Sequence, residues 1–92
     1  VPYRAVDIIE FVSNYITFNK IVMLKLAKVK YEHDDYTKQE LLYIEDALGH
    51  TKFLMTQCSL AANQLTDPQL KRQAQQLINE NQKLFTKFLN LV

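Results

Sequence analysis

The chain has 92 residues, enough for one small domain with a buried core. Hydrophobic residues make up 48% of it, which indicates a folded chain and excludes a disordered one. The net charge of +1 argues against a nucleic-acid-binding surface. A β-sandwich or barrel needs many turns, and one glycine and two prolines are too few to form them. A single cysteine excludes an internal disulfide and is typical of a reducing compartment, so we expect a cytoplasmic protein. Because the chain begins with Val1 rather than Met, we also expect that residues upstream are missing.

The first predicted element is a helix over residues 5–30, which follows a short lead-in containing Pro2. Its apolar stripe has heptad spacing and consists of Ile8, Val12, Tyr15, Asn19, Val22, Leu26 and Val29, widened by Ile9, Ile16 and Met23. Four large apolar residues lie off this stripe: Phe11, Phe18, Ile21 and Leu24. A helix that is apolar on more than one side is buried on more than one side. We therefore predict that these four residues form an assembly surface and that the chain forms a homodimer through this helix.

Two other structures for this segment are compatible with parts of the pattern. Residues 8–29 are long enough to cross a bilayer. Four charged residues interrupt them, Glu10, Lys20, Lys25 and Lys28, and each costs about 2.5–3.5 kcal/mol near a bilayer centre, so no membrane association is expected.

Residues 11–18 and 21–31 are rich in β-branched and aromatic residues, and Asn19-Lys20 could form a hairpin turn between them. The heptad pattern continues through that turn, which favours a helix.

Residues 31–36 predict a polar connector, and a second helix is predicted over residues 38–65. Thr37 and Glu40 have the spacing of a capping box at its start. Its heptad positions are Leu41, Ile44, Leu48, Thr51, Met55, Cys58, Ala62 and Leu65, and Ala47, Leu54 and Ala61 widen one flank. Gly49 lies inside this helix, where glycine costs roughly 1 kcal/mol relative to alanine. Such a glycine would permit a close helix contact or a kink.

Residues 64–70 predict the tip of a helical hairpin. Asp67 can cap a new helix whose first position is Pro68, although Thr66 with Gln69 also has a capping spacing. The third helix is predicted over residues 68–91, with its stripe at Leu70, Ala74, Leu77, Asn81, Leu84, Phe88 and Leu91. Polar residues within apolar stripes, here Asn19 and Asn81, can set the alignment of packed helices.

The predicted fold is therefore all-α: an antiparallel helical bundle of three long helices over about residues 5–30, 38–65 and 68–91. We expect a single domain, in which residues 1–36 form an oligomerisation helix and connector and residues 37–92 form a capped hairpin. The surplus apolar surface of the first helix predicts a four-helix type of bundle that dimerisation completes.

A family resemblance lies in the second half of the chain, in residues 46–54, 61–71 and 77–82 and in Phe85 and Phe88. They combine a small-residue run, a Thr-Asp-Pro turn and a closing aromatic helix, and in these features the chain resembles the spore coat protein F family of endospore-forming bacteria. The resemblance implies a ferritin-like helical hairpin without a metal centre. It also implies a non-enzymatic structural or assembly role in the spore coat or in sporulation, with other coat or sporulation proteins as partners.

Two alternatives involve His50. Asp46 and His50 share a helix face, but a di-metal centre of the ferritin-like type needs Glu-x-x-His pairs, which are absent, so we predict no metal and no cofactor. The run Gly49-His50-Thr51-Lys52 is similar to the phospho-accepting histidine of phosphotransfer helical domains, so the alternative function is a regulatory interaction module that uses His50. The small residues of those domains are replaced here by Phe53-Leu54-Met55.

No catalytic residues are predicted, so we expect the protein not to be an enzyme. Residues 32–35 contain side chains that bind metals, but no second element supplies further ligands, so a solvated linker is expected. Cys58 lies on the apolar stripe of the second helix, where it is expected to be buried and inert.

Overall fold

The computed structural model describes residues 4–92, which form three α-helices and contain no strand. The helices are α1 (Ala5–His33), α2 (Lys38–Gln64) and α3 (Pro68–Leu89). The predicted all-α bundle of three long helices is therefore confirmed. Residues 1–3, including the proline of the predicted lead-in, lie outside the described residues.

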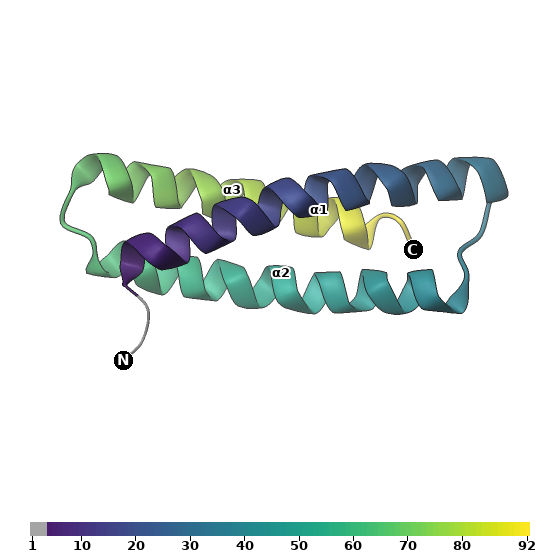
Figure 1. Ribbon diagram of the computed structural model, residues 1–92, viewed down its shortest axis with the longest axis horizontal. Helices are drawn as coiled ribbons and strands as arrows, with labels where there is room; N and C mark the ends of the chain where they lie inside the picture. The colour runs from purple at the N-terminus through teal and green to yellow at the C-terminus, as the bar shows by residue number, and fades with distance from the viewer. Residues whose placement is uncertain (1–3) are drawn as a thin grey trace.

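The three helices form an elongated bundle of 48 × 24 × 16 Å. Helices α2 and α3 run antiparallel and are the most extensively packed pair, and α1 lies obliquely across both of them (Figure 1). The end of α1 and the start of α2 extend beyond the end of α3 (Figure 1). This arrangement leaves one side of α1 without a neighbouring helix.

Helix α1 continues to His33, past the predicted end at residue 30, so the connector is shorter than the predicted residues 31–36. It ends where Asp34 adopts a left-handed conformation (φ 61°), and the Asp34 backbone N–H donates a 2.8 Å hydrogen bond to the Lys30 carbonyl. Tyr36 lies in the connector, as predicted, but the connector is not wholly polar and solvated, because the Tyr36 side chain is only 7% exposed. The Tyr36 hydroxyl donates a 2.9 Å hydrogen bond to the Leu26 carbonyl, so the phenol can be buried without an unpaired polar group.

The starts of α2 and α3 are capped by the residues that the sequence predicts. At α2, the Glu40 backbone N–H donates to Thr37 Oγ1 (3.2 Å) and the Thr37 backbone N–H donates to Glu40 Oε1 (2.8 Å), which completes the capping box. At α3, Asp67 Oδ1 accepts from the backbone N–H groups of Gln69 (2.7 Å) and Leu70 (3.3 Å). Asp67 rather than Thr66 is therefore the cap, with Pro68 at the first helical position.

The interior consists of two apolar clusters, one towards each end of the bundle. One contains Ile9, Val12, Ile16, Leu54, Cys58, Leu65, Ala74 and Leu77. The other contains Leu26, Tyr36, Ile44, Ala47, Leu84, Phe88 and Leu91. Three fully buried polar residues belong to neither cluster: Asn19, Thr51 and Asn81.

The side of α2 that faces the core is not centred on the predicted stripe but lies further towards its predicted flank. Ala47, Leu54 and Ala61, which were expected to be a flank, are buried, whereas Leu41 is 43% exposed. Tyr43 and His50 lie on the same flank and contact α1, so α1 covers this side of α2. The stripe of α3 lies as predicted, with Ala74, Leu77, Asn81, Leu84 and Phe88 all buried.

Candidate functional site

The predicted assembly surface lies on the outside of α1. Phe11, Phe18, Ile21 and Leu24 are all more than half exposed, and Leu24 reaches 72%. Phe11 and Phe18 are one heptad apart and point in nearly the same direction, whereas Leu24 lies towards the opposite edge of the outer side. The structure therefore keeps all four residues out of the core, on a broad strip of α1 rather than along one line.

A second exposed apolar strip runs along α2 and was missed by the sequence analysis. Leu42, Phe53 and Leu60 are each at least half exposed and lie on the side of α2 opposite the core. Their helical spacing was the available signal, but the stronger heptad pattern of the buried side obscured it. Gly49 lies on the same side, and beyond the adjoining backbone of α2 no heavy atom of residues 4–92 lies within 4 Å of the position that a Cβ atom would take there. Gly49 therefore makes no close contact with another helix among residues 4–92, and α2 continues through it.

A layer of polar side chains crosses the middle of the bundle between the two apolar clusters. From α1, Asn19 Nδ2 donates to the Tyr15 carbonyl (3.1 Å), and Asn19 Oδ1 accepts from the Tyr43 hydroxyl of α2 (3.3 Å). From α3, Asn81 Nδ2 donates to the Thr51 carbonyl of α2 (2.9 Å). The polar layer therefore bonds α1 and α3 each to α2. At its solvent edge, Lys20 and Glu80 form an ion pair of 3.5 Å between α1 and α3.

Two oxygen atoms in the polar layer make no hydrogen bond to any of residues 4–92: Thr51 Oγ1 and Asn81 Oδ1. A buried polar atom without a partner costs about 1–3 kcal/mol. These oxygens therefore lower the stability of the bundle, while the hydrogen bonds of Asn19 and Asn81 align the helices. This is the arrangement expected of a polar residue that sets helix register.

Burial affects the ionisation of the two tyrosines in the polar layer. It raises the pKa of Tyr15, and the neighbouring Thr51 and Asn19 side chains offset part of that increase. It also raises the pKa of Tyr43, with a further increase from Tyr15. Both phenols are therefore neutral hydrogen-bonding groups rather than bases near neutral pH.

His50 lies at the exposed edge of the polar layer. Its ring meets the Tyr15 ring edge-on, with centroids 6.5 Å apart and planes inclined by 77°. No hydrogen bond or ion pair joins His50 to Asp46 within residues 4–92. Lys52 points about 200° away around the helix, since successive residues turn by about 100°. His50 therefore has an exposed ring but no cation beside it on α2.

The part of the chain that the structure describes contains no group of three or more His, Cys, Asp or Glu side chains that could hold a metal ion. Glu32 and His33, predicted in a solvated linker, instead form the last turn of α1, where their side chains are 4.0 Å apart and exposed. Cys58 is fully buried, and its thiol lies 3.6 Å from the Ala74 carbonyl of α3. Burial raises the pKa of the Cys58 thiol, so little reactive thiolate forms at neutral pH.

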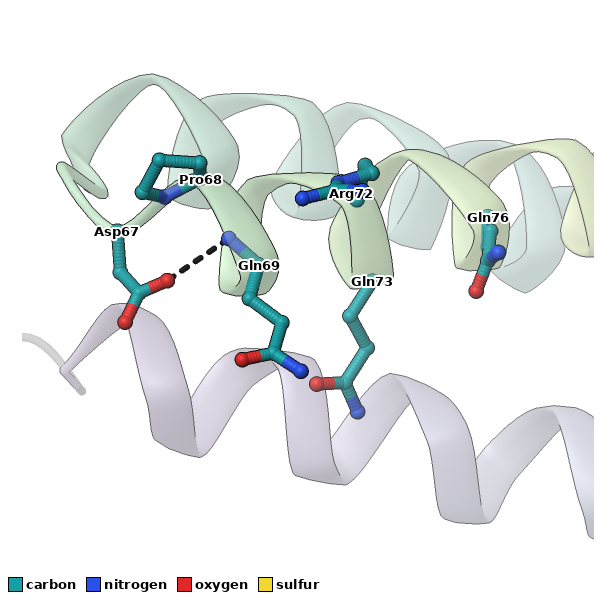
Figure 2. A pocket seen from close by; sticks show the side chains of 6 residues that line it. All are labelled: Asp67, Pro68, Gln69, Arg72, Gln73 and Gln76. Carbon is teal, nitrogen blue, oxygen red and sulfur yellow. Dashed lines mark hydrogen bonds between the residues drawn. The ribbon is translucent and has the colours of Figure 1, made fainter.

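A shallow depression lies at the start of α3, lined by Asp67, Pro68, Gln69, Arg72, Gln73 and Gln76 (Figure 2). It is open to solvent and offers no enclosed space for a small molecule. The Asp67 carboxylate is already occupied by the helix cap, which Figure 2 shows as its bond to Gln69. The remaining polar groups are amides and one guanidinium, which provide neither a nucleophile nor a general base.

The surface features of α1 are therefore the strongest candidates for function. No helix among residues 4–92 is both long enough and apolar enough to cross a membrane. Comparison of the chain with protein-family models, with curated proteins and with solved structures gives no match.

Proposed function

We propose that this is a non-enzymatic structural or assembly protein that acts by helix–helix association, as its resemblance to the spore coat protein F family implies. The supporting observation is the outer side of α1, where Phe11, Phe18, Ile21 and Leu24 are exposed within a short part of one helix. Single exposed apolar residues are normal, whereas several on one helix side are typical of an interaction surface. The first partner is a second copy of the chain, and the dimer forms a ferritin-like, four-helix type of bundle.

In this proposal the dimer is a unit of a larger assembly. Its further partners are other coat or sporulation proteins, and its location is the cytoplasm of a sporulating bacterium or the spore coat. The exposed strip of α2, formed by Leu42, Phe53 and Leu60, is a second surface that such partners could cover. Two separate apolar surfaces on one small bundle suit an assembly protein better than a protein with one partner.

The test is the solution mass, measured by light scattering over a concentration series. We expect the wild type to be a dimer, and Phe18→Lys and Ile21→Lys to shift it to monomer, because each would place a charge in the interface. Phe53→Lys is the matched control, since it puts the same charge at an equally exposed aromatic residue on α2. A wild type that stays monomeric at high concentration would contradict the proposal.

The alternative function is a regulatory module that accepts a phosphoryl group on His50. One observation favours it, namely that His50 is an exposed residue at the surface of the bundle. Lys52, which would stabilise the phosphoryl group, points to another side of α2. Phosphate incorporation that is lost in His50→Gln would support this alternative, and incorporation that survives the substitution would eliminate it.

A further inference from the structure

We infer that the second copy docks on α1 in the antiparallel direction, about a two-fold axis that passes midway between Thr17 and Phe18. The inference rests on the proposed function, because it specifies the partner and the geometry of the same surface. It is carried by the order of the charges along the outer side of α1. Acidic residues come first, at Asp7 and Glu10, and basic residues follow, at Lys25 and Lys28. One further acid, Glu32, lies on this side in the last turn, 3.8 Å from Lys28.

These charges lie in one strip with the apolar residues. At about 100° per residue, Asp7, Glu10, Lys25 and Lys28 all point within about 30° of one direction, which is also the direction of Ile21. All but Asp7, which is half-buried, are exposed. The charges therefore occupy the part of α1 that a second helix packed on its outer side would cover.

The charge order is self-complementary only in an antiparallel pair. Residues at equal distances on either side of the axis then face each other, so Glu10 faces Lys25 of the second copy. By the same relation Asp7 faces Lys28 of the second copy. Phe18 faces Thr17 of the second copy and, being beside the axis, also lies next to its own equivalent. The symmetry makes every such pair occur twice. In a parallel pair, Glu10 would lie against Glu10 and Lys25 against Lys25, which is repulsive.

Contacts within one chain account for two of these four charges, Asp7 and Lys28, but not for Glu10 and Lys25. The helix dipole favours acids at the start and bases at the end of a helix, but its effect is confined to the first and last turns. Glu10 and Lys25 lie inside those limits, and neither forms an ion pair within residues 4–92. Asp7 is paired with Arg4 (3.2 Å) and Lys28 with Glu32 (3.8 Å). The charged groups of both pairs are open to solvent, so a second partner could share the charge.

The same strip is poorly suited to an anionic membrane surface. Lys25 and Lys28 would be attracted to it, but Asp7 and Glu10, towards the other end of the strip, would be repelled. A second copy of the chain satisfies both signs of charge together, which is why it is the occupant that the observations favour.

The experiment uses single charge reversals and measures the dimer dissociation constant by sedimentation equilibrium. We expect Glu10→Lys and Lys25→Glu each to weaken the dimer about tenfold, because two attractive pairs become repulsive. A one-to-one mixture of the two variants should recover wild-type affinity, because each chain then offers the charges that the other needs. Glu45→Lys and Lys83→Glu are the controls, since they make the same charge changes at exposed residues of α2 and α3.

The outcomes separate this inference from the proposed function. If Phe18→Lys dissociates the dimer but the charge reversals do not, or if the mixture stays weak, the antiparallel pairing is wrong while assembly through α1 stands. If the wild type is a monomer, both the antiparallel pairing and assembly through α1 are wrong. The same holds if the dimer is dissociated by Phe53→Lys alone. Monomeric wild type that sediments with phosphatidylserine vesicles would overturn the second copy as the occupant. If a reversal unfolds the chain, Glu10→Gln and Lys25→Gln replace it, with an expected weakening of a few-fold.

Discussion

The side-chain amide of Asn81 in α3 donates a 2.9 Å hydrogen bond to the backbone carbonyl of Thr51 in α2, at a point where both residues are fully buried. The Asn81 carbonyl oxygen has no partner within residues 4–92, so the side chain both links and weakens the bundle. A buried amide of this kind distinguishes one alignment of α3 on α2 from its neighbours, since any shift would leave the whole side chain unpaired.

We expect Asn81→Leu to leave the free energy of unfolding unchanged or to raise it by up to about 1 kcal/mol, because it removes an unpaired buried oxygen. Asn81→Asp should lower it by about 3–5 kcal/mol at neutral pH, because an unpaired charge would be buried. Urea denaturation measures both. The same substitutions at exposed Asn79 are the controls and should have small effects. A large loss for Asn81→Leu would show that the amide contributes more than this one bond.

The tyrosines predict a loss of stability at alkaline pH. Burial raises the pKa of Tyr15, Tyr36 and Tyr43, so the folded chain holds these protons more tightly than the unfolded chain. Their contribution to stability is therefore complete below the unfolded pKa of about 10 and is lost as pH rises through the higher folded values. Denaturation curves between pH 8 and pH 11 should show this fall.

Tyr43→Phe should flatten that pH dependence and lower the stability at pH 7 by about 1 kcal/mol, because Asn19 Oδ1 loses its hydrogen bond. Tyr31→Phe is the matched control, since Tyr31 is 90% exposed and should affect neither quantity. Equal slopes in all three proteins would mean that other groups cause the alkaline loss.

The cap of α3 predicts a local change in stability. Asp67→Ala should lower the free energy of unfolding by about 1 kcal/mol, because the backbone N–H groups of Gln69 and Leu70 lose their acceptor. Asp67→Asn keeps an acceptor oxygen and should retain most of the stability. Thr66→Ala tests the alternative cap and should have little effect. The reverse order for Thr66 and Asp67 would contradict the observed capping geometry.

Gly49→Ala should raise the free energy of unfolding of the monomer by up to about 1 kcal/mol, because alanine favours the helix and its Cβ meets no atom within 4 Å. Thermal unfolding at low protein concentration measures this change. Ser59→Ala, at another exposed position of α2, is the control for helix propensity alone. A weaker dimer in Gly49→Ala would show that the outer side of α2, rather than α1, approaches a partner closely.

The sequence by itself determined where the helices of this protein begin and that there are three of them. Thr37 with Glu40, and Asp67 with Pro68, act through hydrogen bonds and backbone angles within one turn, so their effect is visible without knowledge of the rest of the chain. The apolar stripe of α3 was also predicted correctly, because this helix has one clearly apolar side and a polar remainder.

The tertiary structure decided which sides of α1 and α2 are buried. These helices carry apolar residues on several sides, and the side that enters the core depends on where the neighbouring helices lie. Because α1 packs on one flank of α2, Ala47 and Leu54 are buried and Leu41 is not. The Leu26 carbonyl of α1 accepts a hydrogen bond from the Tyr36 hydroxyl, which allows that side chain to be buried. Such contacts join residues that are distant in sequence, so they cannot be predicted from the local pattern of apolar residues. That pattern specifies the helices, whereas packing selects which apolar side of each helix is buried. On α1 it leaves four residues at the surface: Phe11, Phe18, Ile21 and Leu24.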